Sequence, residues 1–284
     1  MILVTGAKGQ LGADVVLELE RRKQSYVAVD VNEMDITGKT SVDSFLCLHK
    51  PKYVIHCAAY TAVDAAEDDE EKCNRINING AEYLAKACQN IDADLLYVST
   101  DYVFDGQGDA PYESDSPTSP LSVYGRSKLA GEKAVMQNLE RHYILRTSWL
   151  YGENGSNFVK TMLKLADTRD TINVVDDQFG SPTYTIDLAV LICDIILSEK
   201  YGIYHASNEG YCSWAMFAKE IMRLSGSNCI INPIASEQYP TRAIRPKNSR
   251  LSKSSLDNSG FSRLPTWQNA IKRFLERGNP IEIN

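Results

Sequence analysis

The sequence contains no closely spaced cysteine pair, no long apolar run and no leader-like opening. Its 7 cysteines are odd in number and scattered, and no two form a C-x-x-C pair, so neither a disulfide framework nor a zinc cluster is indicated. No stretch approaches the roughly 20 apolar residues that a membrane-spanning helix needs. The chain opens on the strand-like MILVTG, without the basic and apolar regions of a signal peptide. We therefore expect a cytoplasmic protein with reduced cysteines, no membrane partner and no metal.

An excess of basic residues is also missing. The 30 Lys and Arg stand against 37 Asp and Glu, which gives a net charge of −7. Because nucleic-acid binding needs clustered Lys and Arg to neutralise phosphates, we expect no nucleic-acid partner. The 284 residues are enough for one large α/β domain, or for a main domain with a smaller lobe.

Short β-branched runs alternate with helical patterns in the first half of the chain. Near-continuous apolar strands separated by helices predict a doubly wound, Rossmann-like parallel sheet that is covered on both faces. The expected strands are residues 2–6, 26–30, 53–59, 93–100 and 143–152.

After about residue 152 the strands become fewer and shorter. We expect residues 1–152 to form a dinucleotide-binding domain and residues 153–284 to form mainly a smaller α/β substrate-binding lobe. No flexible linker separates the two parts, so they are expected to be interleaved, with later segments able to return to the sheet domain. Residues 239–261 are expected to form a loop before a final short helix.

A glycine-rich segment, TGAKGQLG, joins the first expected strand to the first expected helix. Gly6, Gly9 and Gly12 would allow a tight turn in which backbone amides approach a pyrophosphate at the positive helix N-terminus. Gln10 and Leu11 lie in the same turn and are assigned with the glycines to a dinucleotide cofactor. The alternative is a glycine turn that only packs the helix on the strand.

Residues at other strand ends complete the expected cofactor site. Asp30 ends the second strand, eighteen residues after Gly12, where a carboxylate can accept hydrogen bonds from an adenosine ribose. Such a carboxylate favours NADH because it repels a 2′-phosphate, but Lys8 in the glycine turn could offset that repulsion. NADPH and NADH therefore both stay open. Further candidates for cofactor contact are Asp35, Ile36, Ala58, Ala59 and Tyr60.

The pentapeptide YGRSK places Tyr124 four residues before Lys128, at the start of an expected helix. Alone, this spacing fits an ordinary i,i+4 helix contact better than it fits catalysis. Thr100, however, ends the fourth expected strand, at the edge where doubly wound sheets bind their ligands. With a nicotinamide cofactor supplying the hydride, the three residues can promote the reduction of a ketone: Thr100 donates a hydrogen bond to its oxygen, Tyr124 supplies a proton, and Lys128 stabilises the phenolate.

The glycine turn, the strand-end Thr and the Y-x-x-x-K motif together resemble the extended short-chain dehydrogenase/reductase superfamily. The segments CAAYTAVDAAE, VSTDYVFDG, SPLSVYGRSKLAGE, ILRTSWLYG and DQFGSPTYT resemble more narrowly the dTDP-4-dehydrorhamnose reductase family, from residue 1 to about 250. The resemblance implies NAD(P)H-dependent reduction of the C4 keto group of dTDP-4-dehydro-L-rhamnose to dTDP-L-rhamnose, for cell-surface polysaccharide. It also implies that Tyr124 and Lys128 contact the cofactor, and that Thr100, Asp101 and Trp149 contact the sugar.

Related families leave other functions open. Nucleotide-sugar dehydratases follow the active-site Thr with Asp-Glu, whereas here Tyr102 follows Asp101, which argues against a dehydratase. Epimerases stay open, as does a cofactor-binding regulatory subunit similar to the β subunit of methionine adenosyltransferase. Trp149 could equally be a core residue, and Arg245 could bind a diphosphate or face solvent. Asp14 falls near a position that bridges subunits through a metal in some members, but we see no ligand set; a monomer and a homodimer both stay open.

Overall fold

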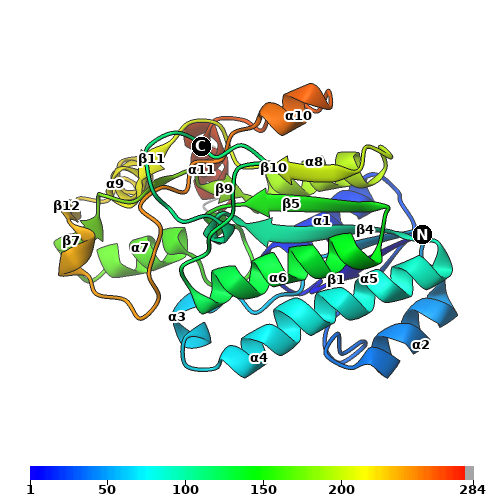
Figure 1. The fold of residues 1–284 in the computed structure, drawn as a ribbon. Helices are drawn as coiled ribbons and strands as arrows, with labels where there is room; N and C mark the ends of the chain where they lie inside the picture. The colour runs from blue at the N-terminus through cyan, green and yellow to red at the C-terminus, as the bar shows by residue number, and fades with distance from the viewer. Residues whose placement is uncertain (279–284) are drawn as a thin grey trace.

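The computed structural model describes residues 1–278, and its centre is a six-stranded parallel sheet (Figure 1). The strand order, β10-β5-β4-β3-β1-β2, confirms the expected doubly wound sheet. The chain moves outward from β1 to β2 on one side and from β3 through β4 to β5 on the other, so a ligand crevice is expected between β1 and β3. The strands are β1 (Ile2–Thr5), β2 (Tyr26–Val29), β3 (Tyr53–His56), β4 (Asp94–Thr100), β5 (His142–Thr147) and β10 (Gly202–His205).

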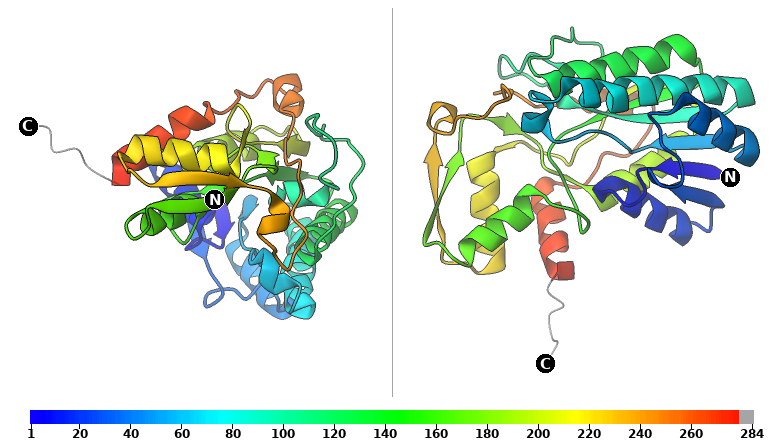
Figure 2. Two further views of the ribbon diagram at one scale, coloured as in Figure 1. Left: turned by 90° about the vertical axis from the view of Figure 1, so that its left-hand side faces the viewer. Right: turned by 90° about the horizontal axis from the view of Figure 1, so that it is seen from below.

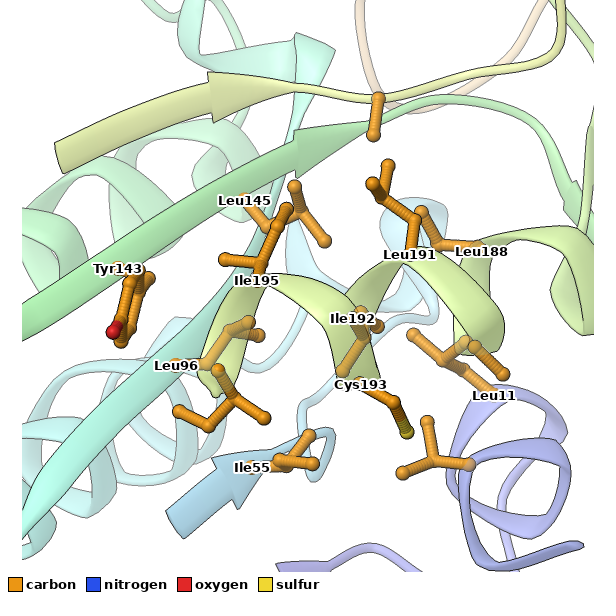
Figure 3. Close-up of a cluster of buried hydrophobic side chains, with 14 of the residues drawn as sticks. Leu11, Ile55, Leu96, Tyr143, Leu145, Leu188, Leu191, Ile192, Cys193 and Ile195 are labelled. Atoms are coloured by element: carbon orange, nitrogen blue, oxygen red, sulfur yellow. The ribbon is translucent and has the colours of Figure 1, made fainter. Parts of the chain in front are cut away.

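Helices cover both faces of the sheet, and the two helical layers are seen edge-on in the right-hand view of Figure 2. On one face, Val54 and Leu95 of the strands belong to an apolar cluster shared with α2, α5 and α6. On the other face, Leu96 and Leu145 pack with α1 and with Ile192 of α8, as Figure 3 shows. These helices are α1 (Gln10–Arg21), α2 (Lys39–His49), α5 (Gly80–Ile91), α6 (Val123–Asn138) and α8 (Thr185–Ile196).

A smaller α/β lobe lies beyond the carboxyl ends of the central strands, on the left in Figure 1. Its own apolar core includes Tyr151, Tyr184, Phe217 and Phe274. Three short strand pairs, β11-β8, β12-β7 and β6-β9, form separate two-stranded sheets within it. The elements of the lobe are β6 (Leu150–Tyr151), α7 (Phe158–Ala166), β7 (Thr171–Val175), β8 (Phe179–Gly180), β9 (Thr183–Tyr184), β11 (Cys212–Ser213), α9 (Trp214–Ser225), β12 (Ile230–Ile234), η3 (Ser236–Gln238) and α11 (Trp267–Gly278).

The strand expected over residues 143–152 is wrong in its second half. β5 ends at Thr147, and Trp149 has a left-handed backbone with φ 50°. A positive φ cannot continue a strand, so the chain leaves the sheet there and Leu150–Tyr151 pair with β9 in the lobe. The loop expected over residues 239–261 contains one short helix, α10 (Ser254–Asn258). Residues 185–205 return to the sheet domain as α8 and β10.

Three short helical pieces connect β3 to α5: α3 (Val63–Ala66), α4 (Glu70–Asn74) and the π-helical turn η1 (Arg75–Asn79). η1 packs against α6, and a further single turn, η2 (Asp101–Val103), follows β4. π-helical turns frequently occur at functional sites. Among the helices within residues 1–278, none combines the length and the apolar character needed to span a bilayer.

Candidate active site

The carboxyl ends of the central strands and the facing edge of the lobe line a cavity of about 700 Å³. Its walls come from loops after several strands, which is where a doubly wound sheet binds its ligands. Gly12 and Tyr60 do not line it. The other residues assigned from the sequence do: Gly6, Gly9, Gln10, Leu11, Asp30, Asp35, Ile36, Ala58, Ala59, Thr100, Asp101, Tyr124, Lys128 and Trp149.

The glycine turn allows three backbone segments to approach one another closely. Gly6 has φ +65°, and a Cβ on it would lie 2.7 Å from the backbone of Ala58. A Cβ on Gly12 would lie 2.1 Å from the carbonyl oxygen of Gly6. Gly12 therefore lets α1 pack against the turn, which explains why it lies behind the cavity wall. No side chain caps the N-terminus of α1, so its first amides can serve an anionic ligand.

Lys8 of the glycine turn contacts two acidic residues, Asp30 and Glu33. The Lys8 backbone N–H donates to Asp30 Oδ2 at 2.6 Å, and Lys8 Nζ lies 3.6 Å from Glu33 Oε1. Glu33 also accepts a hydrogen bond from the Asp30 backbone N–H at 2.9 Å. Sequence reasoning missed Glu33, because no motif marks it. Asp30 is thus held against the glycine turn. The charge of Lys8 is partly neutralised by Glu33, which the assignment of Asp30 to the adenosine ribose did not take into account.

The segment that follows β2 and forms part of the cavity wall is ordered by hydrogen bonds within its own turn. Asp35 Oδ1 accepts hydrogen bonds from the backbone N–H and the hydroxyl of Thr37, at 2.9 and 2.8 Å. Ile36 is buried and lies close to Gly80 at the start of α5, where an added Cβ would be 3.0 Å from Ile36 Cδ1. Both assigned residues therefore stand in a turn that is ordered by its own contacts.

Tyr60 packs against the small apolar cluster of Ala66, Cys73 and Val123 and does not line the cavity, while Asn77 of the π-helical turn holds its backbone. Asn77 Oδ1 accepts from the Tyr60 N–H at 2.8 Å, and Asn77 Nδ2 donates to the Tyr60 carbonyl at 3.1 Å. The same Nδ2 donates to Ser127 Oγ at 2.9 Å. Ser127 lies between Tyr124 and Lys128 on α6, so Asn77 connects the Ala58–Tyr60 segment to the catalytic candidates.

Tyr124 occupies the first turn of α6. The N-cap Ser122 accepts a hydrogen bond from the Gly125 N–H at 3.1 Å, which stabilises this turn. The ring of Tyr102 packs edge-on against that of Tyr124, with centroids 5.6 Å apart. Burial raises the pKa of Tyr124, only partly opposed by Thr100, so the phenol is protonated at neutral pH and available as a donor.

Lys128 lies one helical turn after Tyr124 and is 2% exposed. Its Nζ donates to the Val98 carbonyl at 2.7 Å and lies 3.9 Å from the ring centroid of Tyr97. Burial lowers the pKa of Lys128 to about 7, and the Glu132 carboxylate opposes that shift. The amine therefore titrates close to neutral pH, where a proton-transfer partner is most effective.

Thr100 and Asp101 are hydrogen-bonded to each other at the end of β4. Thr100 Oγ1 donates to Asp101 Oδ1 at 3.0 Å and accepts from the Tyr102 N–H at 3.3 Å. The single hydroxyl proton of Thr100 is therefore engaged, and it must leave Asp101 before it can reach a substrate oxygen. Burial raises the pKa of Asp101 to about 6, opposed by the nearby hydroxyls of Ser249 and Thr100.

Trp149 combines the two roles left open for it. Its indole stacks on Trp214 with centroids 3.6 Å apart and packs against Gly180, where an added Cβ would lie 2.8 Å from the indole. It nevertheless lines the cavity. The positive φ at Trp149 turns the ring out of the sheet and toward the lobe.

Arg245 neither lines the cavity nor stands free in solvent. Its guanidinium pairs with the Asp64 carboxylate and donates to the Tyr102 hydroxyl at 3.2 Å. Asp14 is buried on α1, where its carboxylate accepts a hydrogen bond from Thr185. Within residues 1–278, no three or more His, Cys, Asp or Glu side chains are grouped as metal ligands.

The fold and this cavity place the chain among the Rossmann-like oxidoreductases of the extended short-chain dehydrogenase/reductase class. Within that class it belongs to the family described as RmlD substrate binding domain, whose model matches residues 1–279.

Several relatives match almost the whole chain. The dTDP-4-dehydrorhamnose reductase of Streptomyces griseus is 42% identical over 276 residues, covering 95% of this chain and 91% of the relative. The spore coat polysaccharide biosynthesis protein SpsK of Bacillus subtilis (strain 168) is 41% identical over 275 residues, covering 97% and 96%. The crystal structure of dTDP-4-dehydrorhamnose reductase from Bacillus anthracis, in complex with NADP, has a TM-score of 0.95 and 41% identity, covering 97% and 98%.

Proposed function

We propose that the protein reduces the C4 keto group of dTDP-4-dehydro-L-rhamnose to give dTDP-L-rhamnose, with NADPH or NADH as the hydride donor. One observation carries the proposal: a single cavity joins the uncapped N-terminus of α1 to Thr100, Tyr124 and Lys128. The sugar is taken from the names of the relatives, and the cofactor from the NADP complex of the Bacillus anthracis enzyme.

The residues present fit a nicotinamide dinucleotide. A cradle that excludes any Cβ at Gly6 suits a pyrophosphate approaching the backbone, and Asp30 at the end of β2 suits a ribose hydroxyl. Asp35 and Ile36 would border the adenine, and Ala58 and Ala59 would allow close approach of a flat ring. When bound, the cofactor supplies the hydride.

Tyr124 would donate its phenolic proton to the C4 oxygen as negative charge develops there. The buried phenol holds its proton firmly until that charge appears, because burial has raised its pKa. Lys128 would stabilise the resulting phenolate and hold the ribose hydroxyls next to the reacting ring. Thr100, released from Asp101, would donate to the same oxygen and orient it. Trp149 would place an aromatic face against the deoxy-sugar.

The choice between NADPH and NADH would depend on Lys8, Asp30 and Glu33. A 2′-phosphate near Asp30 meets one cation and two carboxylates. Lys8 can neutralise the phosphate only if it leaves Glu33, so Glu33→Gln is expected to favour NADPH.

Residues 1–152 would hold the cofactor and residues 153–284 mainly the sugar. The free cysteines suit a reducing cytoplasm. The active form would be a monomer or a homodimer.

The test is a coupled assay. The purified chain is supplied with dTDP-4-dehydro-L-rhamnose, generated in situ by the enzymes that make it, and oxidation of NADPH or NADH is followed by absorbance. Oxidation that needs both sugar and protein, with dTDP-L-rhamnose as product, supports the proposal. If NADPH binds but no sugar is reduced, the reductase assignment is rejected in favour of a cofactor-binding regulatory subunit.

A further inference from the structure

The side chain of Gln10 leaves the glycine turn and contacts the lobe. Gln10 is the first residue of α1, lines the cavity and carries one of the backbone N–H groups at the uncapped helix N-terminus. Its Nε2 donates to the Leu150 carbonyl at 3.1 Å, 140 positions away in the chain. Leu150 directly follows Trp149, whose indole is assigned to the sugar. One residue therefore connects the turn expected to hold the pyrophosphate with the residue expected to face the sugar.

Asn157 fixes the orientation of the Gln10 amide. Asn157 Nδ2 donates to Gln10 Oε1 and to the Gly152 carbonyl, both at 2.9 Å. Asn157 Oδ1 accepts from the Lys160 N–H at 3.0 Å and so caps the N-terminus of α7. A carbonyl oxygen only accepts and a backbone N–H only donates, so these partners leave one orientation for each amide. Gln10 thus presents its NH2 group to Leu150.

The loop that ends at Asn157 also reaches the cavity. Gly155 and Ser156 line it, as do Trp149 and Leu150. The hydrogen bonds of Gln10 and Asn157 therefore join the glycine turn to two cavity-lining stretches of the lobe, residues 149–150 and 155–156.

We propose that Gln10 and Asn157 are positioning residues that hold Trp149 at a fixed place relative to the cofactor. This inference rests on the proposed function, in which Trp149 faces the sugar and the glycine turn holds the pyrophosphate. A ligand at the turn and a ligand on the indole each stabilise the same arrangement of turn and lobe. Each ligand should therefore tighten the binding of the other, by the same factor in both directions.

Direct contact between the two ligands is the competing source of such coupling. A sugar that touches the nicotinamide would favour cofactor binding without any help from the lobe. Asn157 does not line the cavity, so its replacement leaves contact between the ligands intact. Dependence of the coupling on Asn157 therefore separates the two explanations.

The experiment measures the Kd of dTDP-L-rhamnose by calorimetry, with and without saturating NADP+, in the wild type, Asn157→Ser and Asn232→Ser. Serine still caps a helix but is too short to donate to Gln10. Asn232→Ser is the matched control, because Asn232 donates to Asn173 at 2.8 Å through the same kind of amide–amide bond at an exposed place in the lobe.

In the wild type and the control, NADP+ is expected to tighten dTDP-L-rhamnose binding by about 5- to 150-fold. In Asn157→Ser the factor should fall below about 2-fold, while the Kd for NADP+ alone changes little. Turnover is compared per NADPH-binding site, which calorimetry counts, so that unfolded molecules do not lower it. On this basis kcat of Asn157→Ser should fall about 10- to 100-fold, because hydride transfer needs closely aligned reacting atoms.

Gln10→Ala and the double variant test whether the two residues act as one unit. If they form one link, the double variant should show the same coupling factor and the same kcat as Asn157→Ser alone. Losses that add in the double variant would overturn the link.

The remaining outcomes separate the link from the activity. If Asn157→Ser keeps the wild-type coupling factor, or if the wild type has none, the link is rejected while the reductase stands on its own assay. If coupling depends on Asn157 but the wild type reduces no sugar, the proposed function fails and the link stands. If dTDP-L-rhamnose does not bind at all, both are rejected.

Discussion

Tyr124 and Lys128 owe their chemical character chiefly to burial. Desolvation holds the proton on the Tyr124 phenol and lowers the pKa of Lys128 to about 7. Neither effect can be seen in the pentapeptide, since the same spacing on an exposed helix would leave both groups near their ordinary values. The site therefore contains a proton donor that is fully protonated at neutral pH, next to an amine that changes charge there.

Replacing Tyr124 with Phe removes the proton donor and leaves the ring. We expect kcat to fall roughly 10²–10⁴-fold, the usual contribution of general acid catalysis, while the Kd for NADPH changes by less than a few-fold. Steady-state kinetics and fluorescence titration measure the two quantities. A variant with nearly normal turnover would exclude Tyr124 as the proton donor.

The variant Asp101→Asn tests whether burial raises the pKa of the Asp101 carboxyl, through the pH dependence of protein stability. Because burial raises its pKa from 3.8 to about 6, the folded state binds more protons than the unfolded state between these values. Wild-type stability should then decrease as pH rises through that window and level off above it. Relative to that of the wild type, the free energy of unfolding of the asparagine variant should rise by roughly 1–3 kcal/mol from about pH 4 to about pH 7.

Denaturant unfolding at the two pH values measures this difference. Asp105→Asn is the matched control, because hydrogen bonding from Tyr112 lowers the Asp105 pKa and the sign of any change should reverse. Equal pH dependence in wild type and Asp101→Asn would contradict the assignment.

At the scale of elements, two local devices position the site. The glycine turn lets β1, α1 and the segment after β3 meet through backbone atoms alone. The π-helical turn η1 presents Asn77, whose amide connects the Tyr60 backbone with Ser127 of α6. Together they place the cofactor end and the reactive end of the cavity relative to each other.

Gly12→Ala should disturb the glycine turn from the side that packs against α1. Its Cβ would collide with the Gly6 carbonyl oxygen at 2.1 Å, so the turn must shift, and we expect NADPH to bind about 10- to 100-fold more weakly. Gly38→Ala is the control, since its Cβ would make an ordinary contact at 3.5 Å. Calorimetric titration of both variants decides the matter: equal affinities would refute the packing role of Gly12.

Asn77→Ala should weaken the connection between the β3 loop and α6. It removes buried hydrogen bonds at both ends of the amide, so the free energy of unfolding should fall by about 2–4 kcal/mol. At the same time kcat should fall more than the affinity for NADPH. Asn79→Ala, two residues later in the same turn, should stay within about 0.5 kcal/mol of wild type. If both variants unfold alike, Asn77 has no special role.

At the scale of the whole molecule, residues 242–245 are held against α3 and the residues that follow it. Asp64 accepts hydrogen bonds from the Ala243 N–H at 3.1 Å and from Arg245, while Arg242 pairs with Asp68. Arg245 reaches Tyr102, whose neighbours are Thr100 and Tyr124. The segment thus joins the two parts of the molecule next to the reactive end of the cavity.

Asp64→Ala should release this segment. Since the ion pair is partly exposed, the loss of unfolding free energy should be about 1 kcal/mol, but trypsin should cleave after Arg242 several-fold faster than in wild type. Glu220→Ala, which removes an exposed ion pair with Arg223 on α9, should change neither quantity appreciably. Unchanged tryptic cleavage in Asp64→Ala would show that the segment is held by other contacts.

Much of this protein can be predicted from its sequence because the relevant signals are local. Alternating apolar runs specify the parallel sheet, the glycine spacing specifies the first turn, and Tyr124 and Lys128 share one helix face whatever surrounds them. The doubly wound sheet and the presence of a smaller α/β lobe are expected from these patterns and from the resemblance they carry, whereas the order of the strands is known only from the structure.

Tertiary structure alone decided the remaining features, because each depends on residues far apart in the chain. The left-handed turn at Trp149 ends β5 early, Arg245 pairs with Asp64 across 181 positions, and Glu33 shares the charge of Lys8. The hydroxyl of Thr147 is a further case: a threonine in a strand carries no local signal, and only the folded structure shows that this buried hydroxyl has no hydrogen-bond partner among residues 1–278.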